Sequence, residues 1–495
     1  LGTNSHRISS GKSDFSGKEI FTMFPPEASI KVYENSAWYG DSWDPLDYGQ
    51  EVDFSRPFLE QFKELLEAVP HMALSVSDGT MVNSDYSNNA SYLKNCYLVF
   101  NADNNEDCMY SDAIYYSKDC IDMLSVTKSE LVYESFWVDH SSRVFFSSEI
   151  ENSLDIYFSK NMRGCSNCFG CIGLRSKNYY IFNEPYSKEE YQKRLLAYGL
   201  GSHRAVESLK SEAKKFYSKF PHKFNQGRNV INSSGEYISN SKNVFRSYQV
   251  REAENVRYCQ FLIAPQNKDC MDLTIWGIGN AWAYEAVVCG LGTNNIKFGS
   301  ECWPSVSDLE YCRYAQASSN CFGCVGIRNK QYCILNKQYT REEYEALRGK
   351  IIAHMNEIPY TDKAGRVYRY GEFFPAEFSP FAYNQTIAQE YFPLAKGEAE
   401  QQGYRWIDAE DKNYAVTLEP ADLPDDIRDA SDSILEQIIG CVHAAGCGGQ
   451  CTRAFRIIEP ELKFYRKMNL PLPRLCPNCR HEERTQKRNP IKASA

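Results

Sequence analysis

The chain lacks any long hydrophobic run. No apolar stretch reaches the roughly 18 residues that a membrane helix needs. Residues 1–19 are polar and contain no apolar core of the kind that a secretion signal has. We therefore expect a cytoplasmic protein without a membrane span. Since disulfides are rare in a reducing compartment, the 19 cysteines are expected to be buried thiols or metal ligands.

The composition predicts a folded protein of several units. Hydrophobic residues make up 43% of the 495 residues and charged residues 24%, which excludes wholesale disorder. At ~100–200 residues per domain, this length predicts three or four units. Tyrosine is abundant, at 34 residues, and favours strands that are half buried.

Charge is distributed unevenly along the chain. The net charge is −9, yet residues 451–495 carry 11 Lys+Arg and only 4 Asp+Glu. A basic tail on an acidic body predicts contact with a polyanion, a solvated surface, or docking of the tail onto the body.

The chain contains a duplication. The string Asn167-Cys168-Phe169-Gly170-Cys171 returns, at an offset of 153, as Asn320-Cys321-Phe322-Gly323-Cys324. Upstream, Asp119-Cys120 matches Asp269-Cys270 at an offset of 150. Two copies of one module are therefore expected, and we expect Cys168 to superpose on Cys321 and Asp119 on Asp269.

Within each copy, short apolar segments recur at steps of about 12 residues, separated by Asn, Asp, Ser and Gly. Cys96, Cys108 and Cys120 follow this step. The pattern favours a mainly β fold of two tandem parallel β-solenoid modules, with these three cysteines stacked and buried. The sequence does not decide whether one solenoid turn consists of one such unit or of two units with ~24 residues in total. The alternative fold is an antiparallel meander or sandwich.

Helices are expected next to the modules. Ser187 and Thr340 each stand three residues before a Glu, the pattern of a capping box. A stripe from Phe58 to Val69 predicts another helix, which we expect to plug the first module. The predicted order is an N-terminal segment with this helix (1–75), module 1 (76–186), a helical connector (187–227), module 2 (228–339), a helical and mixed connector (340–430) and a basic segment resembling a zinc ribbon (431–495).

The C-terminal cysteines have the spacing of a metal site. Cys447 and Cys451 form one pair, and Cys476 and Cys479 form another, each around turn residues. Two thiolate pairs complete the tetrahedral shell of Zn²⁺, so these four residues are predicted to hold one structural zinc ion. Cys441, His443 and His481 are possible substitutes.

Basic residues surround the predicted zinc site, interleaved with aromatic residues, as in proteins that contact phosphates and bases. The partner can equally be a protein, because zinc ribbons also serve as protein-contact modules. The candidate nucleic-acid contacts are Arg453, Arg456, Arg480, Arg484, Lys487 and Arg488.

A second cysteine group, Cys165, Cys168 and Cys171, is less typical of a metal site. The second copy has Ser318 in place of the first cysteine. The favoured interpretation is small, apolar thiols stacked inside the module.

Several strings resemble a family of uncharacterised bacterial zinc-ribbon proteins, frequent in small-genome candidate phyla. They are residues 43–49, residues 53–58, both Asn-Cys-Phe-Gly-Cys strings and residues 461–481. The resemblance covers nearly the whole chain. It implies a zinc ribbon and no particular activity.

Three functions compete. The first is a non-enzymatic binding or scaffold protein with a structural zinc site. The second is a carbohydrate-active or carbohydrate-binding β-helix, for which Asp119, Asp122, Asp269 and Asp272 would supply the carboxylates. If strand residues alternate between faces, Asp119 and Asp122 point to opposite faces, which argues against a catalytic pair. The third is a metal store or redox protein. The first is favoured, because no catalytic constellation is recognisable.

Overall fold

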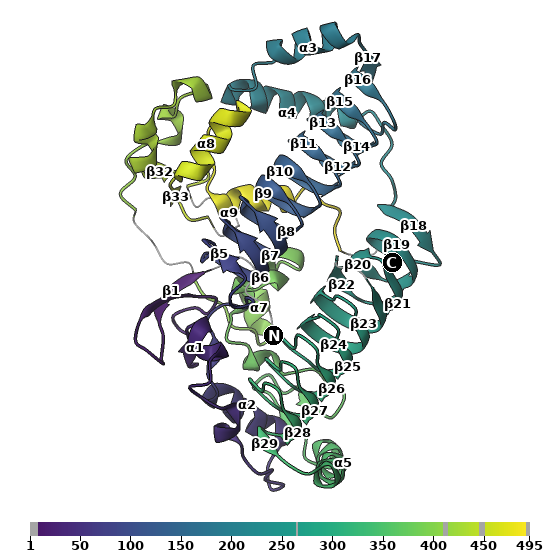
Figure 1. Cartoon of the computed structure of the whole chain (residues 1–495), viewed down its shortest axis with the longest axis vertical. Coiled ribbons are helices and arrows are strands. Elements are labelled where there is room, and N and C mark those ends of the chain that lie inside the picture. Colours follow the sequence, from purple (N-terminus) through teal and green to yellow (C-terminus); the bar gives the residue numbers. More distant parts are fainter. Residues whose placement is uncertain (1–7, 264–265, 409–413, 445–450, 492–495) are drawn as a thin grey trace. The chain divides into compact units, whose positions relative to one another are not determined.

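The computed structural model describes residues 8–263, 266–408, 414–444 and 451–491. Two compact units are present, and each combines segments that are distant in the sequence (Figure 1). Unit 1 comprises residues 1–78, 223–407 and 489–495, and unit 2 comprises residues 79–222 and 408–488. The N-terminal segment therefore folds with residues 223–407, and most of the C-terminal segment folds with residues 79–222.

Unit 2 contains solenoid 1, a stack of parallel strands that ends in a short antiparallel hairpin (Figure 1). Its strands are β5 (Met81–Val82), β6 (Ser87–Lys94), β7 (Tyr97–Glu106), β8 (Met109–Tyr115), β9 (Lys118–Thr127), β10 (Glu130–Asp139), β11 (Ser142–Phe145), β12 (Ser148–Glu151), β13 (Leu154–Tyr157), β14 (Lys160–Arg163), β15 (Ser166–Phe169), β16 (Asn178–Ile181) and β17 (Glu184–Pro185).

One turn of solenoid 1 corresponds to one repeat of the sequence pattern. Val132 lies opposite Cys120 on one side and Val144 on the other, so each repeat closes a full turn. The parallel solenoid is thus confirmed with the shorter of the two expected turns, whereas the turn built from two units and the antiparallel meander are wrong. Cys96, Cys108 and Cys120 occupy the same position in successive turns and are buried, as predicted.

The local period of solenoid 1 is three, where the sequence pattern had suggested alternation. From Asn89 to Asn161 every third residue has a positive φ, between 44° and 60°. Each of these residues makes a corner, and the residue after it is buried inside the turn. Val132, Ser135, Val138 and Ser141 fill one complete turn in this way. Asn and Asp are common at the corners because they tolerate left-handed backbone better than most residues.

Buried serines join successive turns. Ser141 accepts a hydrogen bond from the backbone N–H of Ser153 at 3.1 Å and donates one to the carbonyl of Asp139 at 2.8 Å. The same arrangement recurs at Ser129 and Ser147. The hydroxyls thereby satisfy corner amides that would otherwise be buried without an acceptor.

Unit 1 contains solenoid 2, in which most turns are parallel and the last pair is antiparallel. Its strands are β18 (Gly227–Ile231), β19 (Gly235–Phe245), β20 (Ser247–Arg251), β21 (Ala253–Arg257), β22 (Gln260–Leu262), β23 (Asn267–Trp276), β24 (Ala281–Cys289), β25 (Asn294–Lys297), β26 (Ser307–Glu310), β27 (Ser319–Phe322), β28 (Gln331–Ile334) and β29 (Lys337–Gln338).

The turns of solenoid 2 differ in length. The turn that leads from Val256 to its partner Cys270 is longer than the turn that leads from Leu309 to its partner Cys321. The interior is rich in thiols, among them Cys289, Cys302 and Cys312. On the outside, amides form a ladder in which Asn243 donates to Asn255 at 2.9 Å and Asn255 to Asp269 at 2.8 Å.

Helices and short strands complete the two units. The helices are α1 (Asn35–Tyr39), α2 (Phe58–Ala68), α3 (Lys188–Ala197), α4 (His203–Tyr217), α5 (Arg341–Glu357), α6 (Ile387–Tyr391), α7 (Lys396–Gln401), α8 (Glu459–Met468) and α9 (Pro477–Thr485). The short strands are β1 (Ser9–Lys12), β2 (Glu19–Thr22), β3 (Val32–Tyr33), β4 (His71–Met72), β30 (Tyr360–Thr361), β31 (Val367–Tyr368), β32 (Ile439–Gly440) and β33 (Ala454–Phe455).

The predicted caps are present. The Ser187 side chain accepts from the N–H of Glu190 at the start of α3, and Thr340 forms a complete capping box at the start of α5. Helix α2, however, packs on solenoid 2 and not on the first module: the ring of Phe58 lies 5.2 Å from that of Phe322. The expectation failed because an apolar helical stripe shows that a helix is covered, but not by which part of the chain.

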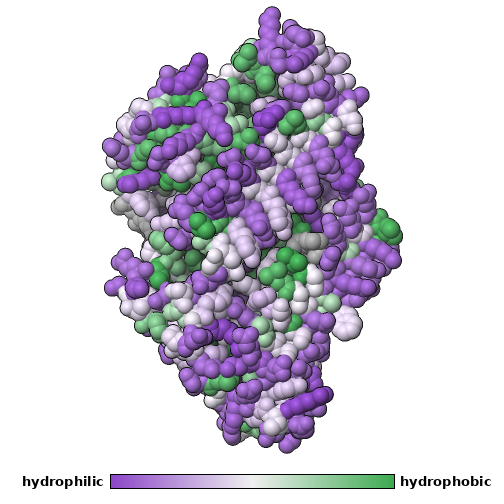
Figure 2. Space-filling model, viewed as in Figure 1, coloured by the Kyte–Doolittle hydropathy of each residue, from purple (hydrophilic) through white to green (hydrophobic). Residues whose placement is uncertain are grey.

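The apolar residues of the core are matched by a mainly polar surface. The face shown in Figure 2 is largely hydrophilic, with scattered hydrophobic residues. In the part of the chain that the structure describes, no helix is both long and apolar enough to cross a membrane.

Candidate metal centre

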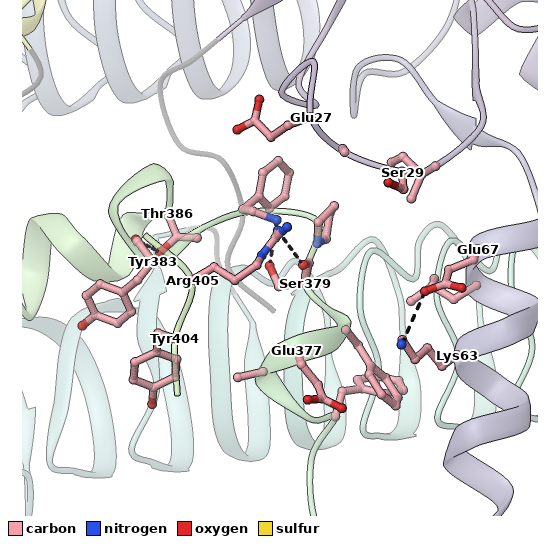
Figure 3. Close-up of a pocket in the computed structure, with 18 of the residues that line it drawn as sticks. Glu27, Ser29, Lys63, Glu67, Glu377, Ser379, Tyr383, Thr386, Tyr404 and Arg405 are labelled. Carbon is pink, nitrogen blue, oxygen red and sulfur yellow. Dashed lines mark hydrogen bonds and ion pairs between the residues drawn. The ribbon is translucent and has the colours of Figure 1, made fainter. Parts of the chain in front are cut away.

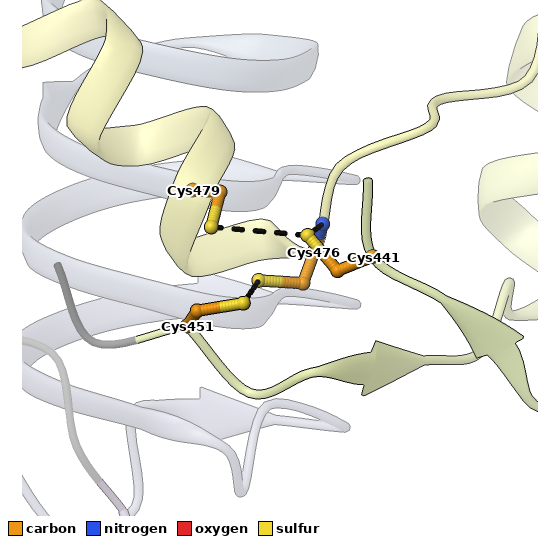
Figure 4. Close-up of side chains that lie close together, drawn as sticks. All are labelled: Cys441, Cys451, Cys476 and Cys479. Carbon is orange, nitrogen blue, oxygen red and sulfur yellow. Dashed lines mark hydrogen bonds between the residues drawn. The ribbon is translucent and has the colours of Figure 1, made fainter. Parts of the chain in front are cut away.

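Four cysteines of unit 2 converge near the C-terminal end of the chain (Figure 4). The sulfur atoms of Cys441, Cys451, Cys476 and Cys479 all lie within 4.8 Å of one another. Cys441, Cys476 and Cys479 are buried and Cys451 is half-buried. Within the described ranges this is the one group of Cys, His, Asp and Glu side chains with the geometry to hold a metal ion.

Two local structures present these thiols. Cys441 directly follows β32, and Cys451 lies three residues before β33, which pairs with β32 in antiparallel register. Cys476 is the N-cap residue of α9, and Cys479 lies in the first turn of that helix. Pro477 begins the helix, a position where the missing N–H of proline costs nothing. One pair of ligands therefore comes from a hairpin and the other from a helix N-terminus.

The distances between the sulfur atoms fit a tetrahedral site. Cys441 Sγ lies 3.8 Å from Cys479 Sγ, and Cys476 Sγ lies 4.0 Å from Cys451 Sγ. Four Zn–S bonds of ~2.3 Å in a tetrahedron place sulfurs about 3.8 Å apart. The residues therefore fit a four-thiolate site for a metal ion.

Local hydrogen bonds stabilise the thiolate of Cys476, while hydrogen bonds between the sulfur atoms raise the pKa of Cys441 and of Cys479. The backbone N–H of Cys476 donates to Cys441 Sγ at 3.3 Å, and the N–H of Arg453 donates to Cys451 Sγ at 3.3 Å. The thiols of Cys441 and Cys479 lower the pKa of Cys476 well below its usual range by hydrogen bonding. The N-terminal end of α9 also favours negative charge on its two cysteines.

The four clustered cysteines include three of the four predicted ligands. Cys451, Cys476 and Cys479 converge as expected, and Cys441, predicted as a substitute, is the fourth member. Cys447 lies outside the described residues, while His443 and His481 do not belong to the group.

Helix α9 also binds solenoid 1 through buried charges. Arg480 Nη1 lies 2.9 Å from Asp122 Oδ2 and 3.3 Å from Glu461 Oε1, and Arg484 Nη1 lies 2.9 Å from Asp122 Oδ1. The side chains of Asp122 and Glu461 are 0% exposed, and that of Arg484 is 1% exposed. Such pairs persist only where both charges are compensated.

Two tyrosines complete this network. Tyr465 donates to Glu461 at 2.7 Å and Tyr110 donates to the other oxygen of Glu461 at 2.9 Å. The guanidinium of Arg480 also lies 4.7 Å from the centre of the Tyr110 ring. The sequence analysis missed this network. A usable signal was the spacing of Arg480 and Arg484, which places both on one face of a helix.

This network changes the interpretation of the basic segment. Arg480 and Arg484 are buried and so are not available to nucleic acid, which corrects their predicted role. Lys487 lies 3.3 Å from Glu134 of solenoid 1. Arg453 and Arg488 are half-buried, and Arg456 is exposed. Charge counts could not show this, because they do not distinguish a solvated cation from one that is paired inside a fold.

No protein-family model, curated protein or solved structure matches this chain. The site must therefore be interpreted from its own geometry.

Two of the four carboxylates proposed for carbohydrate chemistry have partners within the chain. Asp119 and Asp122 both have a positive φ and occupy two successive corners of one solenoid turn. The expectation that they point to opposite faces of a strand was therefore wrong. Asp122 is bound by two arginines, while Asp269 accepts from Asn255 in the outer ladder. Cys165, Cys168 and Cys171 are buried at three consecutive inward positions, as expected for stacked thiols inside the module.

Proposed function

We propose that this protein is a non-catalytic binding scaffold in which a structural zinc ion fastens residues 408–488 onto solenoid 1. One observation supports this most strongly: α9 and its N-cap residue carry two of the four clustered thiols, and α9 carries both arginines that bind Asp122. The metal centre and the docking contact are therefore parts of one rigid element.

The donor set favours a structural role for the metal. Four thiolates fill a tetrahedral shell and leave no position for substrate or water, which a catalytic zinc site requires. When bound, zinc would hold the hairpin β32–β33 against α9 and so fix the arginines at the solenoid surface. Four soft ligands also favour zinc over hard ions such as Mg²⁺.

The buried thiols support a reducing compartment, and we propose a cytoplasmic location. For the partner, we favour a protein over nucleic acid, because two of the six candidate phosphate contacts are buried in intramolecular ion pairs. Long solenoids expose extended surfaces of the kind used for protein recognition.

Metal analysis of the full chain tests this function. Wild-type protein should contain about one zinc per chain. Cys476→Ser should lose zinc and increase hydrogen exchange in α8 and α9, while solenoid 2 keeps its protection. Cys120→Ser, a change of the same kind at a buried thiol inside solenoid 1, should retain zinc. Full zinc loading of Cys476→Ser would contradict the site.

A gel-shift titration at about 50 mM and 200 mM salt tests the choice of partner. Phosphate contacts release counterions, so real nucleic-acid binding weakens steeply between these concentrations. We expect no binding at the lower concentration with zinc loaded. A salt-dependent shift would restore the nucleic-acid hypothesis.

A further inference from the structure

A second region of interest is a cavity in unit 1, about 650 Å³ in volume. It is enclosed by the loop at residues 27–30, by helix α2 and by the segment at residues 374–405 (Figure 3). Figure 3 shows Glu27 and Ser29 on one side, Lys63 and Glu67 on α2, and Tyr404 and Arg405 opposite. Cavities of this size hold small organic ligands in other proteins.

Two deeply buried polar residues line this cavity. Arg313 is 4% exposed, and its Nη2 bonds to the hydroxyl of Tyr314 at 3.1 Å. His71 is 1% exposed, and its Nε2 lies 2.8 Å from the carbonyl of Leu66. Because a carbonyl only accepts, Nε2 carries the hydrogen and Nδ1 is an acceptor.

Both residues have buried nitrogens without a hydrogen-bond partner among the described residues. These are Nε and Nη1 of Arg313, which are donors, and Nδ1 of His71, which is an acceptor. His71 and Arg313 line the same cavity, and the positive charge of Arg313 is, after burial, a cause of the low pKa of His71.

Arg313 differs from the buried arginines of unit 2 in its charge balance. Arg480 has Asp122 and Glu461 within ion-pair distance, whereas Arg313 forms no ion pair in the described part of the chain. Burial raises the pKa of the Glu301 carboxyl and the charge of Arg313 acts to lower it, but this carboxylate accepts its hydrogen bond from the hydroxyl of Ser75 at 2.7 Å. A buried cation without a carboxylate in contact is costly, and a bound anion would offset that cost.

The walls and rim suit an anion with a planar apolar body. Phe374, Phe378 and Phe381 line the walls. At the rim, Lys63 lies 3.7 Å from Glu67, and Glu377 is engaged by the N–H of Lys363 at 3.1 Å. Glu27, a third acidic group at the cavity, accepts a hydrogen bond from the side-chain amide of Gln385 at 2.9 Å, and Arg405 adds a further positive charge.

We propose that this cavity binds a small organic acid whose carboxylate or phosphate group is held by Arg313. The His71 Nδ1 accepts a hydrogen bond from a hydroxyl or N–H of the ligand, and the phenylalanines contact its planar body. Both anionic groups share the oxyanion chemistry that a guanidinium recognises.

Calorimetric titration of the full, zinc-loaded chain tests the proposal with benzoate, phenyl phosphate, inorganic phosphate and benzamide as probes. We expect one of the two ring-bearing anions to bind with one site per chain, and the preferred anion assigns carboxylate or phosphate. Benzamide, which has the ring without the charge, should bind at least tenfold more weakly than benzoate. Equal binding of benzamide, or no binding of either ring-bearing anion, would overturn the proposal.

Substitutions locate the site. Arg313→Gln should weaken binding of the preferred anion at least tenfold, while Arg143→Gln, on the surface of solenoid 1, should leave it unchanged. An unchanged affinity in folded Arg313→Gln would overturn the assignment. Inorganic phosphate should bind at least tenfold more weakly than phenyl phosphate, and equal affinity would remove the role of the phenylalanines. If Arg313→Gln does not fold, the contrast between benzoate and benzamide in the wild-type chain tests the same charge recognition.

Discussion

The role of Asp122 in the structure differs from the role that the sequence predicted for it. In the sequence it is a candidate catalytic carboxylate, and in the fold it receives hydrogen bonds from Arg480 and Arg484, each at 2.9 Å. We expect Asp122→Asn to lower the free energy of unfolding of unit 2 by about 3–5 kcal/mol, because it leaves buried cations undercompensated. Urea denaturation measures this difference.

The matched control for Asp122→Asn is an ion pair on the outside of the same solenoid. Arg143 lies 2.5 Å from Asp155, with the arginine side chain 42% exposed. Arg143→Gln should cost only about 0–1 kcal/mol, since water already solvates the pair. Equal losses of unfolding free energy in the two variants would show that the buried network stabilises unit 2 no more than an exposed ion pair does.

His71 predicts a pH dependence for unit 1. Burial, followed by the charge of Arg313, lowers its pKa from 6.5 to about 3. Between these values the unfolded chain binds a proton that the folded chain does not, so stability falls as the pH drops below about 6.5. The loss should be about 2 kcal/mol between pH 6.5 and pH 5. His71→Gln should remove this part of the slope in urea denaturation, and an unchanged slope would show that His71 is not held neutral.

At the scale of the strand and turn, the serine ladder stabilises solenoid 1. Ser141→Ala removes the acceptor of the Ser153 N–H and should cost about 1–3 kcal/mol, because that amide stays buried. Ser148→Ala, at a half-buried strand position, should change stability by no more than about 0.5 kcal/mol. Thermal unfolding of both variants provides the comparison. A neutral Ser141→Ala would mean that water or a backbone shift replaces the hydroxyl.

The elements differ in how well the sequence predicted them. The step between Cys96, Cys108 and Cys120 was visible because stacked turns place similar residues at equal spacing, and it predicted the parallel solenoid. The period of three was missed, because the buried column mixes Ser, Val, Cys and Met, which do not form one hydrophobic class. Cys476 and Cys479 were predicted from their spacing, whereas Cys441 was only a substitute. The docking face of α2 and the partner of Asp122 depend on contacts between distant segments, which a sequence pattern does not contain.

The whole molecule should unfold in two steps. Each unit has its own hydrophobic core, and the four clustered cysteines belong to unit 2. Calorimetry should therefore show two transitions, of which a chelator such as EDTA lowers only one. Readdition of Zn²⁺ should restore it, as binding to the folded state alone requires. A single transition that moves as a whole would show that the units unfold together.

The unequal turns of solenoid 2 have a consequence for how such a chain tolerates mutation. In a flat strand, one inserted residue turns every following side chain to the opposite face. Here Val256 and its partner Cys270 are further apart along the chain than Leu309 and its partner Cys321, yet both pairs face the same interior. The longer turn therefore absorbs its extra residues locally, and the stacking resumes in the next turn. Single-codon insertions in solenoid 2 should accordingly be tolerated far better than the same insertions in a flat strand.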